Sequence, residues 1–213
     1  MCISAELSFS TWIVSSLIAC YIIYRNNKND IWVGACILII SIMQLIDFLI
    51  WISQTNDKLN IISTKIAFLI LWLQPLWFIV FSLFSKTRIP SIIQKFLILI
   101  LSFTFLYACY FINKINEFED SIWITRPGPN NHLVWNFFNN DNIKKFPKIL
   151  QFDWRYYIIF AVFLFMIPFW KGCIVAALII GTFIISLLYS YIEFGSIWCW
   201  LITGLSIIWT FIN

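Results

Sequence analysis

Long apolar runs separated by short polar clusters are the feature that most constrains the fold of this chain. Cutting the 213 residues at clusters of charge, Asn, Gly and Pro leaves runs at 8–24, 31–53, 61–84, 91–112, 156–170, 172–192 and 196–212. A helix needs about 20 apolar residues to cross the hydrocarbon core of a bilayer. We therefore expect an all-α integral membrane bundle of seven transmembrane helices, forming a single domain over residues 1–213. The run 156–170 would be only about 22 Å long as a helix, so six spans are the alternative.

The composition supports a membrane location and excludes one class of partner. Hydrophobic residues make up 62% of the chain and charged residues 11%, against roughly 25% charged in soluble proteins. Membrane lipids are therefore expected partners. The net charge of +4 is spread over loops and forms no basic stripe, so a nucleic acid partner is not expected.

The distribution of basic residues predicts an orientation. The loops after the first, third and fifth runs are basic and nearly free of acidic residues, through Arg25, Lys28, Lys86, Arg88 and Lys171. Loops of this kind are typical of the cytoplasmic side. We therefore expect an extracytoplasmic N-terminus.

One face of the second run carries polar groups inside an apolar stretch. Gln44, Asp47 and Trp51 fall on the same side of a helix at this spacing. A carboxylate there is too costly to expose to lipid and must face protein or water. It can line a polar cavity, or it can pair with Lys65 or with hydroxyl and indole groups of neighbouring helices and fix how they dock.

Further polar residues are expected at the same end of an antiparallel bundle. We predict a ligand-binding recess in which acidic side chains provide charge and the others provide hydrogen bonds and packing: Ser4, Glu6, Gln44, Asp47, Trp51, Glu193 and Ser196. Two of these have a simpler structural explanation. Ser196 can cap the last helix, and Glu193 can be stabilised by the positive end of that helix.

Cys2 and His132 admit more than one interpretation. The imidazole of His132 can generate a thiolate at Cys2, which makes the two residues candidates for a catalytic pair. A lone cysteine and a lone histidine are a weak signal, however. Cys2 can instead form a disulfide with Cys199 or Cys109 on an oxidising face, or be a small buried apolar side chain.

The segment 113–155 between the fourth and fifth runs is rich in aromatic residues. It is too apolar for a disordered linker, and its turn at Pro127-Gly128-Pro129 favours a folded structure. We expect it to fold back over the mouth of the bundle or to lie in the membrane interface.

The sequence also excludes two classes of seven-helix protein. The run 196–212 contains no lysine for a retinal Schiff base, and the single histidine His132 is too few for a zinc-dependent membrane hydrolase. We expect no metal and no cofactor.

Three stretches of the chain carry a resemblance to a known group of proteins. They are the opening Met1-Cys2-Ile3-Ser4-Ala5-Glu6-Leu7-Ser8-Phe9, the Gln44, Asp47 and Trp51 face, and Gly195-Ser196-Ile197-Trp198-Cys199. Together they resemble an uncharacterised family of polytopic membrane proteins of giant DNA viruses and bacteria, whose bacterial members are expected to carry Glu in place of Asp47. The resemblance implies no activity. It implies that the following residues form one set at one end of the bundle: Cys2, Ser4, Gln44, Asp47, Trp51, Ser196 and Cys199.

Three functional hypotheses follow. The first is binding or transport of a small polar molecule, a cation or a lipid headgroup through the polar recess. The second is a membrane-embedded hydrolase or acyltransferase with Cys2 as nucleophile, His132 as base and Glu6 or Asp47 as the orienting acid. The third is a structural membrane protein without a ligand.

Overall fold

The computed structural model describes residues 4–27, 29–83, 91–146 and 169–190, together with 193, 197, 201, 204, 207, 208 and 210. Of these residues 80% are helical, so the expected all-α class is confirmed. Most of the expected span 156–170 lies outside the described residues, as do the site candidates Cys2, Ser196 and Cys199. The residues described between 197 and 210 are helical.

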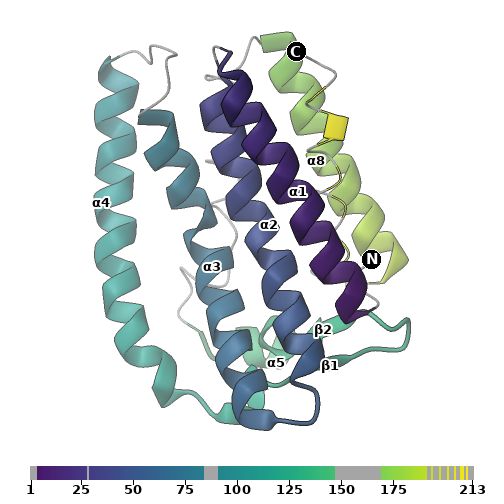
Figure 1. The fold of residues 1–213 in the computed structure, drawn as a ribbon. Coiled ribbons are helices and arrows are strands. Elements are labelled where there is room, and N and C mark those ends of the chain that lie inside the picture. The colour runs from purple at the N-terminus through teal and green to yellow at the C-terminus, as the bar shows by residue number, and fades with distance from the viewer. Residues whose placement is uncertain are drawn as a thin grey trace.

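Five long helices make up most of the described structure (Figure 1). They are α1 (Ala5–Arg25), α2 (Asp30–Ile52), α3 (Asp57–Leu83), α4 (Ser91–Lys114) and α8 (Phe169–Tyr189). The first four lie within a few residues of the expected runs. Helix α8 begins and ends three residues before the expected run 172–192.

Local signals explain where α1 begins and ends. The side chain of Ser4 accepts a hydrogen bond from the backbone N–H of Leu7 and so caps the helix. Asn26 ends it in the left-handed conformation, with φ of 56°. Arg25 then forms a 2.7 Å ion pair with Asp30, the first residue of α2, which closes this tight helical hairpin.

Small residues allow α1 and α2 to pack closely. Three small residues are buried on the inner face of α1: Ser8, Ser15 and Ala19. Small side chains at a helix interface let the two helix backbones approach closely. The hydroxyls of Ser8 and Ser15 donate to carbonyls of their own helix. On α2, a Cβ added at Gly34 would lie 2.9 Å from the carbonyl oxygen of Ala19, so only glycine permits this approach.

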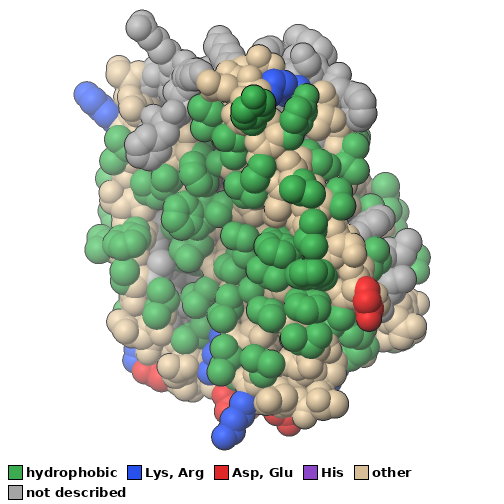
Figure 2. Space-filling view, viewed as in Figure 1, with side chains coloured by type: hydrophobic (Ala, Val, Ile, Leu, Met, Phe, Trp, Pro, Cys, Tyr) green, Lys and Arg blue, Asp and Glu red, His purple; other side chains and the backbone are tan. Residues whose placement is uncertain are grey.

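The outer surface of the bundle is apolar along most of its length. Figure 2 shows hydrophobic side chains covering the middle of the visible face, with most charged side chains toward its ends. Leu17 on α1, Phe103 on α4 and Leu188 on α8 are 65%, 67% and 82% exposed. In the part of the chain that the structure describes, two helices, α1 and α2, are by length and composition apolar enough to cross a membrane.

Residues 115–146 form a compact layer at one end of the bundle, which we call the cap segment (Figure 1). It contains η1 (Ile115–Glu117), η2 (Asp120–Trp123), β1 (Thr125–Pro127), β2 (Leu133–Trp135), η3 (Asn136–Phe138) and α5 (Asn140–Ile143). The two strands are antiparallel, with Thr125 opposite Trp135. This hairpin is an addition to the expected all-helical fold.

An aromatic cluster packs the cap segment against α3. The ring of Phe68 on α3 lies 5.4, 5.2 and 5.3 Å, between centroids, from the rings of Trp123, Phe137 and Phe146. These rings belong to one core with Met43, Ile46 and Ile50 of α2 and other buried residues. The expectation that this aromatic segment folds back on the bundle is thus confirmed for residues 115–146.

Hydrogen bonds fix the hairpin of the cap segment to the start of α3. The backbone N–H of Thr125 donates to Oδ1 of Asn60 at 2.8 Å, and Nδ2 of Asn60 donates to the carbonyl of Thr125 at 3.0 Å. The hydroxyls of Thr64 and Thr125 are 2.9 Å apart. Asn60, Thr64 and Thr125 are all fully buried, so these bonds are shielded from water.

We predict that Asn60→Ala destabilises the protein by about 1–3 kcal/mol. The change leaves the N–H of Thr125 buried without its partner, which costs about 1–3 kcal/mol, while the carbonyl of Thr125 keeps a 3.2 Å hydrogen bond from Nε2 of Gln54. Thermal unfolding of the purified protein measures the loss. The matched control is Asn113→Ala, because Asn113 is exposed and bonds only a carbonyl of its own helix. Equal melting temperatures for the two variants would contradict the role assigned to Asn60.

Candidate functional site

Gln44 and Asp47 lie one turn apart on α2, and neither side chain is exposed. The buried residues of this part of α2 also include Met43, Ile46 and Ile50. The first turns of α1 lie alongside, since the ring centroids of Phe9 and Phe48 are 5.0 Å apart. The carboxylate of Asp47 therefore faces the protein interior, which agrees with the cost of placing it in lipid. Trp51, one turn further along α2, is half-buried.

The alternative in which Asp47 pairs with Lys65 is wrong. The ammonium group of Lys65 bonds Oδ1 of Asn116 at 3.2 Å and pairs with Asp120 at 3.6 Å. It also lies 5.9 Å from the ring centroid of Trp123. Lys65 thus reaches outward to the cap segment, where a long cationic side chain stays in contact with water.

Glu193 is held by the loop between β1 and β2. The backbone N–H of Asn130 donates to Oε1 of Glu193 at 3.0 Å, and the side-chain amide of Asn130 donates to Oε2 at 2.8 Å. The backbone carbonyl of Glu193 accepts from the N–H of Ile197 at 3.3 Å. The carboxylate of Glu193 is thus satisfied by the hairpin loop.

The loop that binds Glu193 is closed by its own backbone. The N–H of Gly128 donates to the carbonyl of His132 at 2.7 Å, and Asn131 adopts a left-handed conformation with φ of 58°. A Cβ added at Gly128 would overlap the carboxylate of Glu193 and lie 2.7 Å from Cγ2 of Val134. Glycine is required here because the carboxylate packs directly on the loop.

The surroundings of Glu193 hold its pKa below the ordinary value. Burial by itself raises the pKa of this carboxyl group, but hydrogen bonds from the side chain and the backbone of Asn130 lower it. Bonds from the Ser190 side chain and from the backbone of His132 act in the same direction. Glu193 is therefore a negative charge at neutral pH, although its side chain is fully buried.

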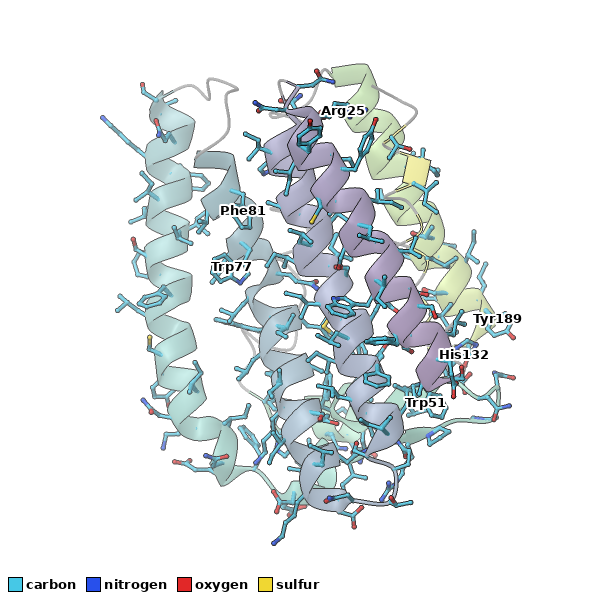
Figure 3. All side chains as sticks on the ribbon, viewed as in Figure 1. Arg25, Trp51, Trp77, Phe81, His132 and Tyr189 are labelled. Carbon is cyan, nitrogen blue, oxygen red and sulfur yellow. The ribbon has the colours of Figure 1, made fainter. Side chains whose placement is uncertain are left out.

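His132 is fully buried, and neither of its ring nitrogens forms a hydrogen bond with the described residues. Its ring lies edge-on to Tyr189 at the end of α8, with centroids 6.0 Å apart (Figure 3). Burial lowers the pKa of His132, and the nearby charge of Glu193 only partly offsets this. The imidazole is therefore neutral at pH 7 and offers one donor and one acceptor.

Other predicted site residues have different surroundings. Ser4 is committed to capping α1, and Glu6 is exposed in the first turn of that helix. The exposure of Glu6 argues against its expected place in a sheltered recess. Cys109 is a free, exposed cysteine on α4, so the alternative disulfide between Cys2 and Cys109 is not formed.

Among the described residues, no group of three or more His, Cys, Asp and Glu side chains is placed to hold a metal ion.

Sequence reasoning missed the residues that hold Glu193, namely Gly128, Asn130 and Ser190. The run from Pro127 to Asn131 predicts a turn, but nothing in a turn signal shows that the loop binds a carboxylate more than sixty positions away.

No family model, curated protein or solved structure matches this chain.

We predict that Gly128→Ala destabilises the protein by about 1–3 kcal/mol, since the new methyl group displaces Glu193 or distorts the loop. Gly181→Ala is the matched control, because a Cβ at Gly181 on α8 meets no atom within 4 Å. In a helix interior that control should be neutral or stabilising by up to about 1 kcal/mol. Chemical or thermal unfolding compares the two, and a Gly128→Ala protein as stable as the control would show that the loop is not packed on the carboxylate.

Proposed function

We propose that this chain is a multi-pass integral membrane protein of seven spans. Its buried polar groups at the cap end bind a small polar molecule, a cation or a lipid headgroup. The observation that carries the proposal is the full burial of Gln44 and Asp47 inside a bundle whose outer surface is apolar. An intramembrane ionisable group facing the protein interior marks a functional site by default.

The exposed side chains support a membrane location. Helices α1, α4 and α8 have 21, 24 and 21 residues, or about 32–36 Å of helix, which matches a hydrocarbon core of about 30 Å. Large apolar side chains are exposed along each of them, and on α4 they include Phe96, Phe103 and Leu106. In water such a surface would be an extended apolar patch, which soluble proteins avoid. The basic loops favour the cap segment on the extracytoplasmic side.

The distribution of buried polar groups along α2 favours binding over transport. Between Gln44 and Asp30, about 21 Å along the helix, the buried residues are Trp32, Val33, Gly34, Ala35, Cys36, Ile37, Ser41 and Met43. The Ser41 hydroxyl donates to a carbonyl of its own helix, and Asp30 is paired with Arg25. The described part of α2 thus has buried polar side chains near the cap segment and mostly apolar buried side chains along the middle of the helix. This arrangement suits a binding site that is open only at the cap end.

The same geometry disfavours the enzyme hypothesis. A catalytic histidine donates a hydrogen bond from one ring nitrogen to the acid that orients it, but neither ring nitrogen of His132 bonds a carboxylate of the described residues. Glu6, one of the two acids expected to orient the base, is exposed.

Ligand binding monitored by thermal shift, on the purified full chain in lipid nanodiscs, tests the proposal. The panel contains Na⁺, Ca²⁺, glycerol, ethanolamine and choline, with nanodiscs of different headgroups. We expect at least one probe to raise the melting temperature of the wild type. We expect the Asp47→Asn variant to bind that probe with an apparent affinity at least tenfold weaker, because the substitution removes the charge while keeping the size of the side chain.

The control is Asp141→Asn, which removes an acid that is almost fully exposed. Unchanged affinity in Asp47→Asn, or no stabilisation of the wild type by any probe, would contradict the proposal. A loss of stability without a loss of affinity in Asp47→Asn would assign Asp47 to helix docking.

A further inference from the structure

Strand β2 of the cap segment packs into the same buried core as the face of α2 that carries Asp47. Met43 and Ile50 lie about one turn to either side of Asp47 and share its face of the helix. They belong to one core with Leu133 and Trp135 of β2, and the cap segment lies across this end of the bundle (Figure 1). A ligand that enters from the cap end therefore reaches Asp47 only when part of the cap segment moves aside.

The base of the hairpin is fixed to the bundle by several hydrogen bonds. Thr125 exchanges two buried bonds with Asn60 of α3, and its carbonyl also accepts from Nε2 of Gln54 at 3.2 Å. The neighbouring Arg126 donates to the backbone carbonyl of Gln54 at 2.6 Å and forms an ion pair with Asp57. Buried, multiply bonded backbone of this kind is among the last parts of a protein to open.

The tip of the hairpin, residues 128–132, is held in a different way. Within the described part of the chain, every hydrogen bond that joins these residues to the rest of the protein goes to Glu193. Two of the bonds come from Asn130 and one from the backbone of His132. Asn130 is exposed, and the ring of His132 adds one edge-on contact with Tyr189. Local opening is easiest where hydrogen bonds are accessible to water, so opening costs less at the tip than at the base.

We propose that the tip of the hairpin is a gate to the polar end of the bundle. The gate is closed when Asn130 bonds Glu193. It opens when these bonds break and the tip moves away from Glu193, while the base stays fixed at Thr125. This inference rests on the proposed binding function and adds control of ligand entry to it.

The chemistry of the Glu193 contact suits a gate. Hydrogen bonds to a carboxylate are stronger than those between neutral groups, so the closed state is favoured. When the tip opens, water can replace the amide donors of Asn130 at the carboxylate, and this exchange keeps the net cost of breaking the bonds small. The gate can therefore open without unfolding the core beneath it.

Chemical labelling of carboxyl groups tests the gate on the purified full chain in lipid nanodiscs. A water-soluble carbodiimide with glycine ethyl ester converts accessible carboxyl groups to amides, and mass spectrometry of peptides gives the labelling rate at each acid. We expect slow labelling of Asp47 in the wild type, because the gate limits access. Asn130→Ala removes a bond that closes the gate and should raise the labelling rate of Asp47 about tenfold. Because Asn130 is exposed, this variant keeps the fold.

The chain supplies its own controls. Asp30 is also fully buried, but it lies at the opposite end of α2 and is paired with Arg25, so its labelling rate should not change. Asn113→Ala is the matched variant, because Asn113 is an exposed asparagine that bonds a carbonyl of its own helix; it should leave the rate at Asp47 unchanged. Glu193→Ala removes all bonds to the carboxylate and should raise that rate further. If Glu193→Ala does not fold, Asn130→Ala decides alone.

An unchanged labelling rate of Asp47 in Asn130→Ala overturns the inference. An equal rise at Asp30 also overturns it, because the whole bundle would then be opening. The labelling needs no bound ligand, so the gate and the proposed function can fail separately. If Asp47 is labelled faster as expected but no probe of the thermal-shift panel binds, the hairpin controls access to Asp47 and the binding function is wrong. If a probe binds but the labelling rate does not change, only the gate is wrong.

Discussion

The burial of a carboxylate within an apolar bundle is the constraint on which the rest of this structure depends. Asp47 sits in the second helix, where contact with lipid would be costly, and its side chain is fully buried. The helices must therefore enclose it. The small buried residues Ser8, Ser15 and Ala19 let α1 approach α2, while apolar side chains turn outward on α1, α4 and α8. Burying Asp47 inside the bundle thus leaves apolar side chains on the outer surface, where they can contact lipid.

The cap segment connects parts of the bundle that are far apart in sequence. Asn60 and Thr64 at the start of α3 hold Thr125. The hairpin that begins there carries the loop that binds Glu193 beyond the end of α8. His132, in the same hairpin, meets Tyr189 (Figure 3). A neutral imidazole and a buried carboxylate are brought together at the cap end in this way, although neither lies in a long helix.

The sequence predicts the helices well because their signals are local. Long apolar runs interrupted by polar clusters locate α1 to α4 within a few residues. Ser4, which we expected in the ligand-binding recess, caps α1 instead. The burial of Asp47 and Gln44 follows from the cost of polar groups in lipid. Contacts between distant segments carry no such signal. The bond between Asn130 and Glu193, the pairing of Lys65 with the cap segment and the exposure of Glu6 depend on how the cap segment docks, which spacing along the chain does not encode.

The central claim is that lipid covers the apolar faces of the bundle while the cap segment lies in water. Spin labels attached one at a time at Leu17, Leu106 and Leu188, and at Glu117 in the cap segment, test this most directly in bilayers. All four positions are exposed. Oxygen concentrates in the hydrocarbon core and a nickel chelate stays in water. The account predicts that oxygen increases the relaxation rate of the spin labels at the three apolar positions more than the chelate does. The label at Glu117 should show the reverse. The account would be contradicted if the chelate increased the relaxation rate of the labels at Leu17, Leu106 and Leu188 as strongly as that of the label at Glu117.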